Sequence, residues 1–129
     1  MRIIKVIGMW TLQILLGALF VVVGAAKFGD PGWARKFAAW GYADSFRIVV
    51  GVLEIAGGLM VLVPRVAPYG SLLIMTIMVG AAITHLQHGE MQRLAAPLVY
   101  LAVAAAVGWL RRSSAISPSR GRGPERAVV

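Results

Sequence analysis

Four long apolar runs, separated by short segments with proline, glycine and charged residues, dominate the sequence. The first run covers about 6–28, close to the roughly 20 residues that a helix needs to cross a bilayer. Three more follow at about 45–63, 68–88 and 94–110. The pattern therefore predicts an all-α fold, an integral membrane bundle of four helices.

A short amphipathic segment follows the first run. Residues 29–32 (GDPG) break the first helix, and Trp33, Phe37 and Trp40 then recur at helical spacing. Tryptophan side chains favour the membrane surface, so the segment is interpreted as a short interfacial helix between helices 1 and 2. A connecting loop that happens to be aromatic is the alternative.

The boundaries of the later helices rest on caps and prolines. Asp44 or Ser45 is expected as the N-cap of the second helix, which stops at Pro64. Pro68 suits the first turn of the third helix, and Gly89 its end. Residues 1–112 are thus expected to form one transmembrane domain.

Residues 113–129 are rich in serine, proline, glycine and arginine, and we predict a disordered basic cytoplasmic tail. The N-terminal run also invites a second interpretation, a secretory signal peptide with Arg2 and Lys5 as its basic end. Its apolar stretch is longer than the usual region of about 7–15 residues, which favours a membrane-spanning helix.

Composition agrees with a lipid environment. Apolar residues make up 59% of the 129 residues and charged residues 14%, and a soluble domain of this size cannot hide so much apolar surface. The net charge is +8, but the basic residues flank the apolar runs, so no nucleic-acid partner is inferred. The chain has no cysteine, which excludes disulfides, thiolate metal sites and a dithiol relay of its own.

Four crossings put both termini on the same side. Basic residues outnumber acidic ones on that side, whose cations are Arg2, Lys5, Arg65 and the tail arginines. On the other side, acidic residues partly offset the basic ones. The bias predicts a multi-pass protein of the cytoplasmic membrane with both termini in the cytoplasm.

Glu54 lies in the second predicted span, roughly 14 Å from its outer end at 1.5 Å per residue. An ionisable group at that depth needs a compensating partner. Gly51, Gly57 and Gly58 share its face, and small residues allow another helix to approach closely. Glu54 is therefore expected to point into the bundle.

Lys27 ends the first helix on the same outer side, on a face with Gly17 and Gly24. We predict an ion pair between Lys27 and Glu54 that offsets the burial of both groups. Two alternatives stay open: Lys27 reaches the interface by itself, or Glu54 is a protonated carboxyl that hydrogen-bonds a neighbour.

His85, near the outer end of the third helix, and Tyr100, about 9 Å below the same boundary in the fourth, lie at similar depth. The Tyr100 hydroxyl is placed to donate to Glu54 or His85, so Lys27, Glu54, His85 and Tyr100 can form one polar cluster. His85 and His88 have a spacing that can bind a metal, but no zinc motif accompanies them and we predict no metal site.

Four short stretches resemble the DoxX-like family in order and spacing: 16–20 (LGALF), 24–28 (GAAKF), 51–59 (GVLEIAGGL) and 81–85 (AAITH). The resemblance covers roughly Leu12 to Leu110. It implies a four-helix membrane fold. The family takes its name from a subunit of an archaeal thiosulfate:quinone oxidoreductase. Other relatives are associated with membrane redox complexes and oxidative-stress defence, and a distant animal branch holds a receptor-assembly chaperone.

The family's recurrent Lys and Glu correspond to Lys27 and Glu54 here. One hypothesis is therefore an accessory subunit of a membrane redox or oxidative-stress complex, whose polar cluster meets a quinone headgroup or a partner's cofactor. The other is a non-enzymatic scaffold or assembly factor. A small transporter ranks third, because one protomer is too small unless it forms a homo-oligomer. An enzyme that acts on its own ranks below the first two.

Overall fold

The computed structural model describes residues 2–114, and that range folds entirely into helices and short connections. The elements are α1 (Arg2–Gly29), α2 (Pro31–Ala39), α3 (Asp44–Leu62), α4 (Ala67–Gln87), η1 (Met91–Arg93), α5 (Ala95–Leu110) and η2 (Arg112–Ser114), where η marks a single 3-10 turn. Most of the predicted tail, 115–129, lies outside the described residues, while residues 113 and 114 belong to η2.

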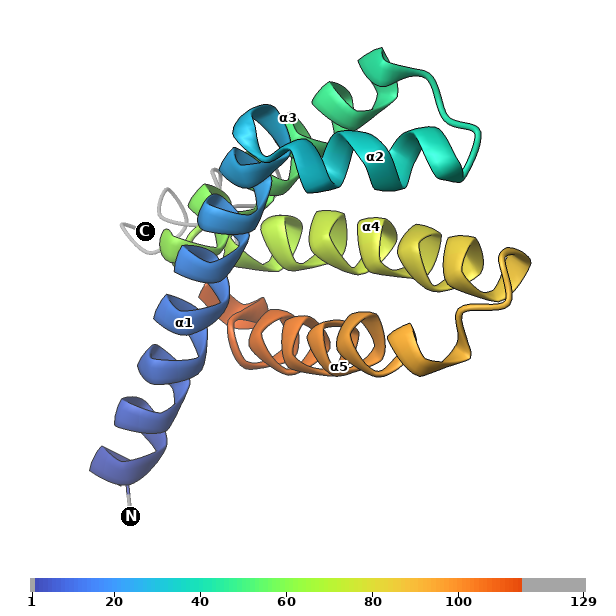
Figure 1. Cartoon of the computed structure of the whole chain (residues 1–129). Helices are drawn as coiled ribbons and strands as arrows, with labels where there is room; N and C mark the ends of the chain where they lie inside the picture. Colours follow the sequence, from blue (N-terminus) through green and yellow to red (C-terminus); the bar gives the residue numbers. More distant parts are fainter. Residues whose placement is uncertain (1, 115–129) are drawn as a thin grey trace, which may run out of the picture.

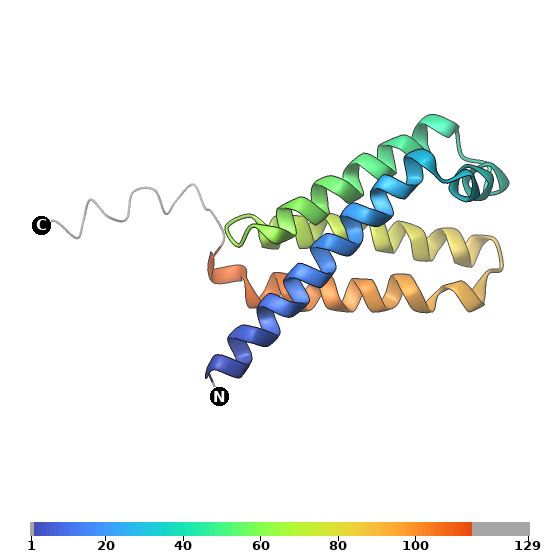
Figure 2. The same cartoon turned by 60° about the vertical axis from the view of Figure 1, so that its left-hand side comes forward.

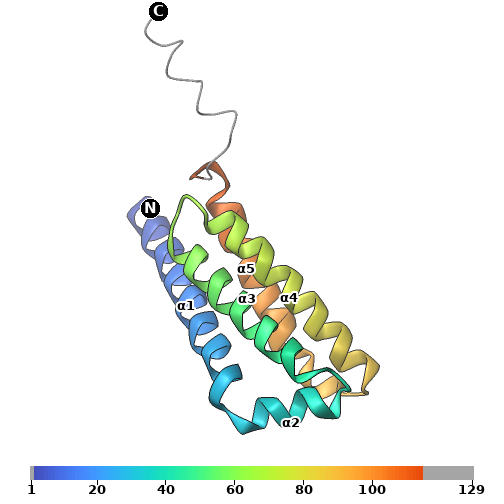
Figure 3. The same cartoon turned by 90° about the horizontal axis from the view of Figure 1, so that it is seen from above.

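α4 and α5 run side by side, and α1 crosses them at an angle (Figure 1). α1 and α3 form the most extensive helix contact, and α4 packs on both α5 and α3. The view from above shows α2 linking the ends of α1 and α3 (Figure 3). The first and last described residues lie together at the end opposite α2 (Figure 2).

Local sequence explains where the helices turn. The Asp30 side chain caps α2 by accepting a hydrogen bond of 2.8 Å from the Gly32 N–H, and Pro31 occupies the first turn. After α2 and α4 the chain reverses at Gly41 (φ 85°) and Gly89 (φ 68°), where the left-handed backbone favours glycine.

The predicted N-cap of the second helix is wrong. α3 begins at Asp44 itself, with Ala43 at the cap position and no side-chain cap. The Asp44 carboxylate pairs instead with Arg47 Nη2 at 2.8 Å, one turn along the same helix. A charged partner three residues away competes with the backbone N–H groups for this carboxylate.

Glycines set the crossing of α1 and α3. A Cβ atom on Gly24 would lie 2.7 Å from the Gly51 carbonyl oxygen, and one on Gly58 would lie 2.7 Å from the Gly17 carbonyl oxygen. Backbone therefore meets backbone at two levels of this crossing, a distance that only small residues allow.

A second close crossing joins α3 to α4. A Cβ on Gly70 would lie 2.8 Å from the Gly57 carbonyl oxygen. Gly57 thus belongs to a different interface from Gly58, its neighbour in sequence. Gly70 was not among the predicted packing glycines, because nothing in the sequence indicates which face of the third helix meets the second.

Four helices are long and apolar enough to cross a membrane: Arg2–Gly29, Asp44–Leu62, Ala67–Gln87 and Met91–Leu110. The apolar core between them is small: Leu16, Phe20, Val61, Ile74, Met78, Ala104 and Val107. Many large apolar side chains, such as Leu15 and Val22, face outward and remain more than half exposed. A lipid environment accounts for that outer surface, so the protein is a multi-pass membrane protein built as an all-α bundle.

Candidate functional site

A buried ion pair links α1 to α3 near the α2 end of the bundle. Lys27 Nζ lies 2.6 Å from Glu54 Oε1, and the two side chains are 5% and 2% exposed. The pairing expected from the sequence is therefore present. The Gly24–Gly51 crossing one turn away holds the two helices close enough for the short Glu54 side chain to reach.

Lys27 has a second partner on α2. Its Nζ atom lies 3.8 Å from the centroid of the Trp33 ring, a distance typical of a cation–π contact. The carboxylate and the ring together compensate an ammonium group that lipid alone would not tolerate. The lysine thus joins three helices: its own α1, α3 through Glu54 and α2 through Trp33.

Arg47 of α3 lies close to the ion pair and contacts the end of α1. Its Nη1 donates to the Lys27 carbonyl oxygen, and its Nε donates to Asp44 Oδ1 at 3.0 Å. The last carbonyls of α1 have no partner within the helix, so this contact satisfies one of them. Arg47 was not part of the predicted polar cluster. Its spacing of three from Asp44 was the one available signal of a partly buried pair.

A partly open cavity of about 710 Å³ lies beside the ion pair, with residues of all five α-helices in its wall. Its wall is mainly apolar and aromatic, with Phe20, Trp33, Phe37, Trp40, Tyr42 and Phe46. The polar groups in the wall include Lys27, Glu54, His85 and Tyr100. Such a chamber suits a ligand with a flat apolar body and a few polar atoms.

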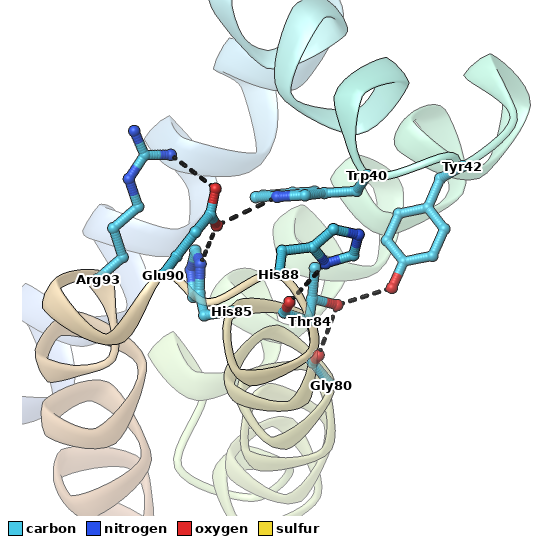
Figure 4. A network of polar contacts seen from close by, with 8 residues as sticks. All are labelled: Trp40, Tyr42, Gly80, Thr84, His85, His88, Glu90 and Arg93. Carbon is cyan, nitrogen blue, oxygen red and sulfur yellow. Dashed lines mark hydrogen bonds and ion pairs between the residues drawn. The ribbon is translucent and has the colours of Figure 1, made fainter.

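A separate polar network ties the chain just after α2 to α4 and to the α4–α5 connection (Figure 4). Glu90, in the α4–α5 connection, accepts a hydrogen bond of 3.1 Å from Trp40 Nε1 just beyond α2. The same oxygen lies 2.8 Å from His85 Nδ1, which must therefore carry the proton it donates. Arg93 Nη1 lies 3.7 Å from the other carboxylate oxygen.

This network lowers the pKa of Glu90 below its ordinary value. The hydrogen bond from His85 contributes most; the hydrogen bond from Trp40 and the charge of Arg93 act in the same direction. Glu90 is therefore ionised at neutral pH and holds its partners as a carboxylate.

Tyr42 and Thr84 form a second tie between the α2–α3 connection and α4 (Figure 4). The Thr84 hydroxyl donates to the Gly80 carbonyl oxygen at 2.9 Å, so it accepts the hydrogen bond of 2.7 Å from the Tyr42 hydroxyl. His88 Nδ1 donates to the Thr84 carbonyl oxygen at 2.8 Å. The Nδ1 atoms of the two histidines are thus directed at different groups: a carboxylate for His85 and a backbone carbonyl for His88.

The structure brings the four predicted cluster residues to one cavity but not into one network. His85 bonds to Glu90, whereas Glu54 pairs with Lys27. Tyr100 packs its ring edge-on against Phe20 at 5.5 Å, and among residues 2–114 its hydroxyl forms no hydrogen bond to Glu54 or His85. The predicted hydrogen bond of Tyr100 is therefore wrong, because the ring packing directs its hydroxyl elsewhere.

The DoxX-like family matches residues 11–107, a range that includes the ion pair, the cavity wall and the Glu90 network. No curated protein and no solved structure matches the chain. Since the matched range covers well over half of the sequence, the chain belongs to the DoxX-like family.

Proposed function

We propose that the chain binds the headgroup of a lipophilic quinone in the cavity beside Lys27 and Glu54, as an accessory subunit of a membrane redox complex. The observation that carries the proposal is an aromatic cavity of about 710 Å³ that contains a buried ion pair. Ligand cavities commonly measure about 300–1,000 Å³ and combine an apolar wall with a few polar groups.

The donors in the wall suit the carbonyl oxygens of a quinone. Lys27 has three N–H donors, and Glu54 and the Trp33 ring do not use all of them. The Tyr100 hydroxyl adds a further donor. His85 donates to Glu90 through Nδ1, so Nε2 of the neutral ring is an acceptor and suits a hydroxyl group of the reduced quinol. Lys27 and Tyr100 are the residues that would hold the two carbonyl groups, with Trp33 and Phe37 against the ring.

A bound quinone supplies two-electron, two-proton chemistry. The contribution of this chain would be to bind and orient the ring and to hold a proton between Lys27 and Glu54, whose short contact lets either group carry it. The chain has no cysteine, so a dithiol electron donor would have to come from a partner subunit. For this reason we propose an accessory subunit rather than an enzyme that acts alone.

The test is to purify the protein in mild detergent and identify bound lipophilic molecules by mass spectrometry. We expect about one quinone per chain, and a loss of binding in Glu54→Gln. Tyr100→Phe keeps the ring against Phe20 and removes only the hydroxyl, so it should weaken binding about five- to tenfold. Arg65→Gln, at the other end of the bundle, is the control. Wild-type protein that binds no added quinone would contradict the proposal.

A scaffold or assembly factor is the second candidate, and one observation favours it. Both charges of the Lys27–Glu54 pair have partners within the chain, so the pair needs no ligand and can act as a lock between α1 and α3. In that case the purified protein should have an empty cavity and retain a membrane protein partner, or a second copy of itself, under the same conditions.

We also propose that the chain lies in the cytoplasmic membrane with both ends in the cytoplasm. The end of the bundle opposite α2 carries Arg2, Lys5 and Arg65. At the α2 end, several cations are paired with carboxylates. Because the chain lacks cysteine, single cysteines report sidedness: a membrane-impermeant maleimide should label Gln92→Cys but not Ser114→Cys in intact cells. The reverse labelling would overturn the orientation.

A further inference from the structure

A buried arginine at the end of the bundle opposite α2 has no acidic partner among residues 2–114. Arg111 follows the last residue of α5 and is only 8% exposed. Its Nε donates to Gln13 Oε1 on α1 at 2.8 Å, and its guanidinium carbon lies 4.5 Å from the centroid of the Trp10 ring. Arg111 thus lies where α1 and α5 meet, at the end that holds the first and last described residues (Figure 2).

The other buried cations show how unusual this is. Lys27 and Arg47, the remaining buried basic residues in the described range, each pair with a carboxylate within 2.8 Å. No carboxylate in residues 2–114 pairs with Arg111, and neither of its terminal nitrogens donates a hydrogen bond there. A buried charge without a counter-charge is strongly unfavourable, and the Trp10 ring offsets it only in part.

Gln13, which bonds to Arg111, is a second buried polar residue at this end of the bundle. Its side chain is fully buried, and its Oε1 accepts from Arg111. Within the described part of the chain, neither Gln13 Nε2 nor the buried Arg111 Nη2 has a hydrogen-bond partner. Two donor groups of adjacent side chains therefore lack an acceptor, and an anion between them would satisfy both.

We propose that Arg111 and Gln13 form a binding site for the phosphate group of an anionic phospholipid. Arg111 lies one residue beyond the span Met91–Leu110, at the depth where phospholipid headgroups begin. The planar guanidinium matches the oxygens of a phosphate, and because Trp10 covers one face, the phosphate would meet its edge.

The surroundings favour a lipid over a soluble phosphate. Trp10 and Trp109 are 37% and 66% exposed, as is typical of tryptophan side chains at the level of lipid headgroups. Arg112 is exposed beside the site, with its guanidinium carbon 3.8 Å from the centroid of the Trp109 ring. It adds attraction for a net negative headgroup without contacting Gln13. The site lies at the far end of the bundle from the cavity, so it does not depend on the quinone proposal.

The experiment compares three probes on purified protein in detergent: phosphatidylglycerol, phosphatidylcholine and inorganic phosphate. Native mass spectrometry counts the retained lipids, and thermal unfolding measures the stabilisation. We expect phosphatidylglycerol to bind and raise Tm, with the other two probes much weaker. Arg111→Gln should weaken phosphatidylglycerol binding about tenfold or more, the loss expected for charge-assisted hydrogen bonds. Arg112→Gln is the matched control and should lose far less.

The proposal also predicts the effect of Arg111→Gln on thermal stability when no lipid is present. Because it removes an uncompensated charge, it should unfold at the same or a higher temperature than wild type in lipid-free detergent. If this variant does not fold, Gln13→Leu, which removes the second donor, replaces it in the binding assay. Equal binding of phosphatidylglycerol and phosphatidylcholine, or equal loss in Arg112→Gln, would overturn the proposal. Inorganic phosphate that protects as well as phosphatidylglycerol would overturn the assignment to a lipid.

Discussion

Removing one partner of the Lys27–Glu54 pair leaves the other charge in a site that is almost closed. The two side chains are 5% and 2% exposed, so water does not replace the lost contact. Losing one partner of a buried pair typically destabilises a protein by about 3–5 kcal/mol. We expect about 3 kcal/mol for Glu54→Leu, near the lower limit, because the Trp33 ring at 3.8 Å still stabilises Lys27. Lys27→Met should lose at least as much, because Glu54 keeps no comparable partner.

The double variant, Lys27→Met with Glu54→Leu, tests whether the two charges stabilise each other. With both charges gone, two apolar side chains of similar volume fill the site, and such replacements are often close to neutral. Lys27→Met with Glu54→Leu should therefore unfold at a free energy closer to wild type than either single variant. Lys36→Met is the control, because Lys36 also lies over the Trp33 ring at 4.4 Å but is exposed. It should change the free energy of unfolding by less than about 0.5 kcal/mol.

The assay is reversible unfolding in mixed micelles, followed by far-ultraviolet circular dichroism, with the four proteins compared as a double-mutant cycle. The reasoning requires a strong coupling energy between positions 27 and 54. If the losses of the two single variants simply add in the double variant, the pair does not lock α1 to α3, and the two charges must be stabilised separately.

Two further predictions concern the crossing of α1 and α3 and the contacts of Glu90 that hold α2. Gly24→Ala should destabilise the bundle by about 2 kcal/mol in the same unfolding assay, because the added Cβ would meet the Gly51 backbone. Gly80→Ala is the control: no atom lies within 4 Å of a Cβ there, so this variant should be neutral or stabilising. Because the folded protein lowers the pKa of Glu90, its hold on α2 is present above the ordinary value of 4.5 and is lost as pH falls through the lower folded value. The protection of α2 amides against hydrogen exchange, taken relative to the intrinsic exchange rate at each pH, should therefore fall at acidic pH in wild type. In Glu90→Gln this protection should be low already at neutral pH, and protection as high as in wild type there would contradict the role of Glu90.

The sequence predicts the spans and the α1–α3 interface well, for a physical reason. Lipid forces every spanning segment to be apolar and helical, so length and hydropathy identify it. Within such a segment a charge or a glycine repeat is conspicuous. The faces of Lys27 and Glu54 follow from helical spacing alone. Both residues lie in the same half of the bundle, Lys27 less than one turn and Glu54 roughly 14 Å from the outer end of its helix, and the long lysine side chain covers the difference in depth.

The contacts at the α2 end were beyond the reach of the same reasoning. Trp40 and Glu90 are 50 residues apart, and both lie outside the long helices, where no periodicity fixes the direction of a side chain. Tyr100 shows a related limit: depth counting placed it beside Glu54, but its rotation about the helix axis depends on packing against Phe20. Depth can be read from a membrane sequence, whereas the meeting of helix faces depends on the packed bundle.

The buried cations at the two ends of the bundle have different partners, and this difference predicts how a bound ligand would affect stability at each end. At the α2 end, Lys27 and Arg47 have carboxylates within the chain, so that end can stay folded whether its cavity is filled or empty. At the other end, the contacts of Arg111 within residues 2–114 are an amide and a ring, and the proposed compensation is an external anion. Ligand exchange in the cavity therefore need not threaten the fold, whereas the stability of the α1–α5 contact should follow the lipid composition around it.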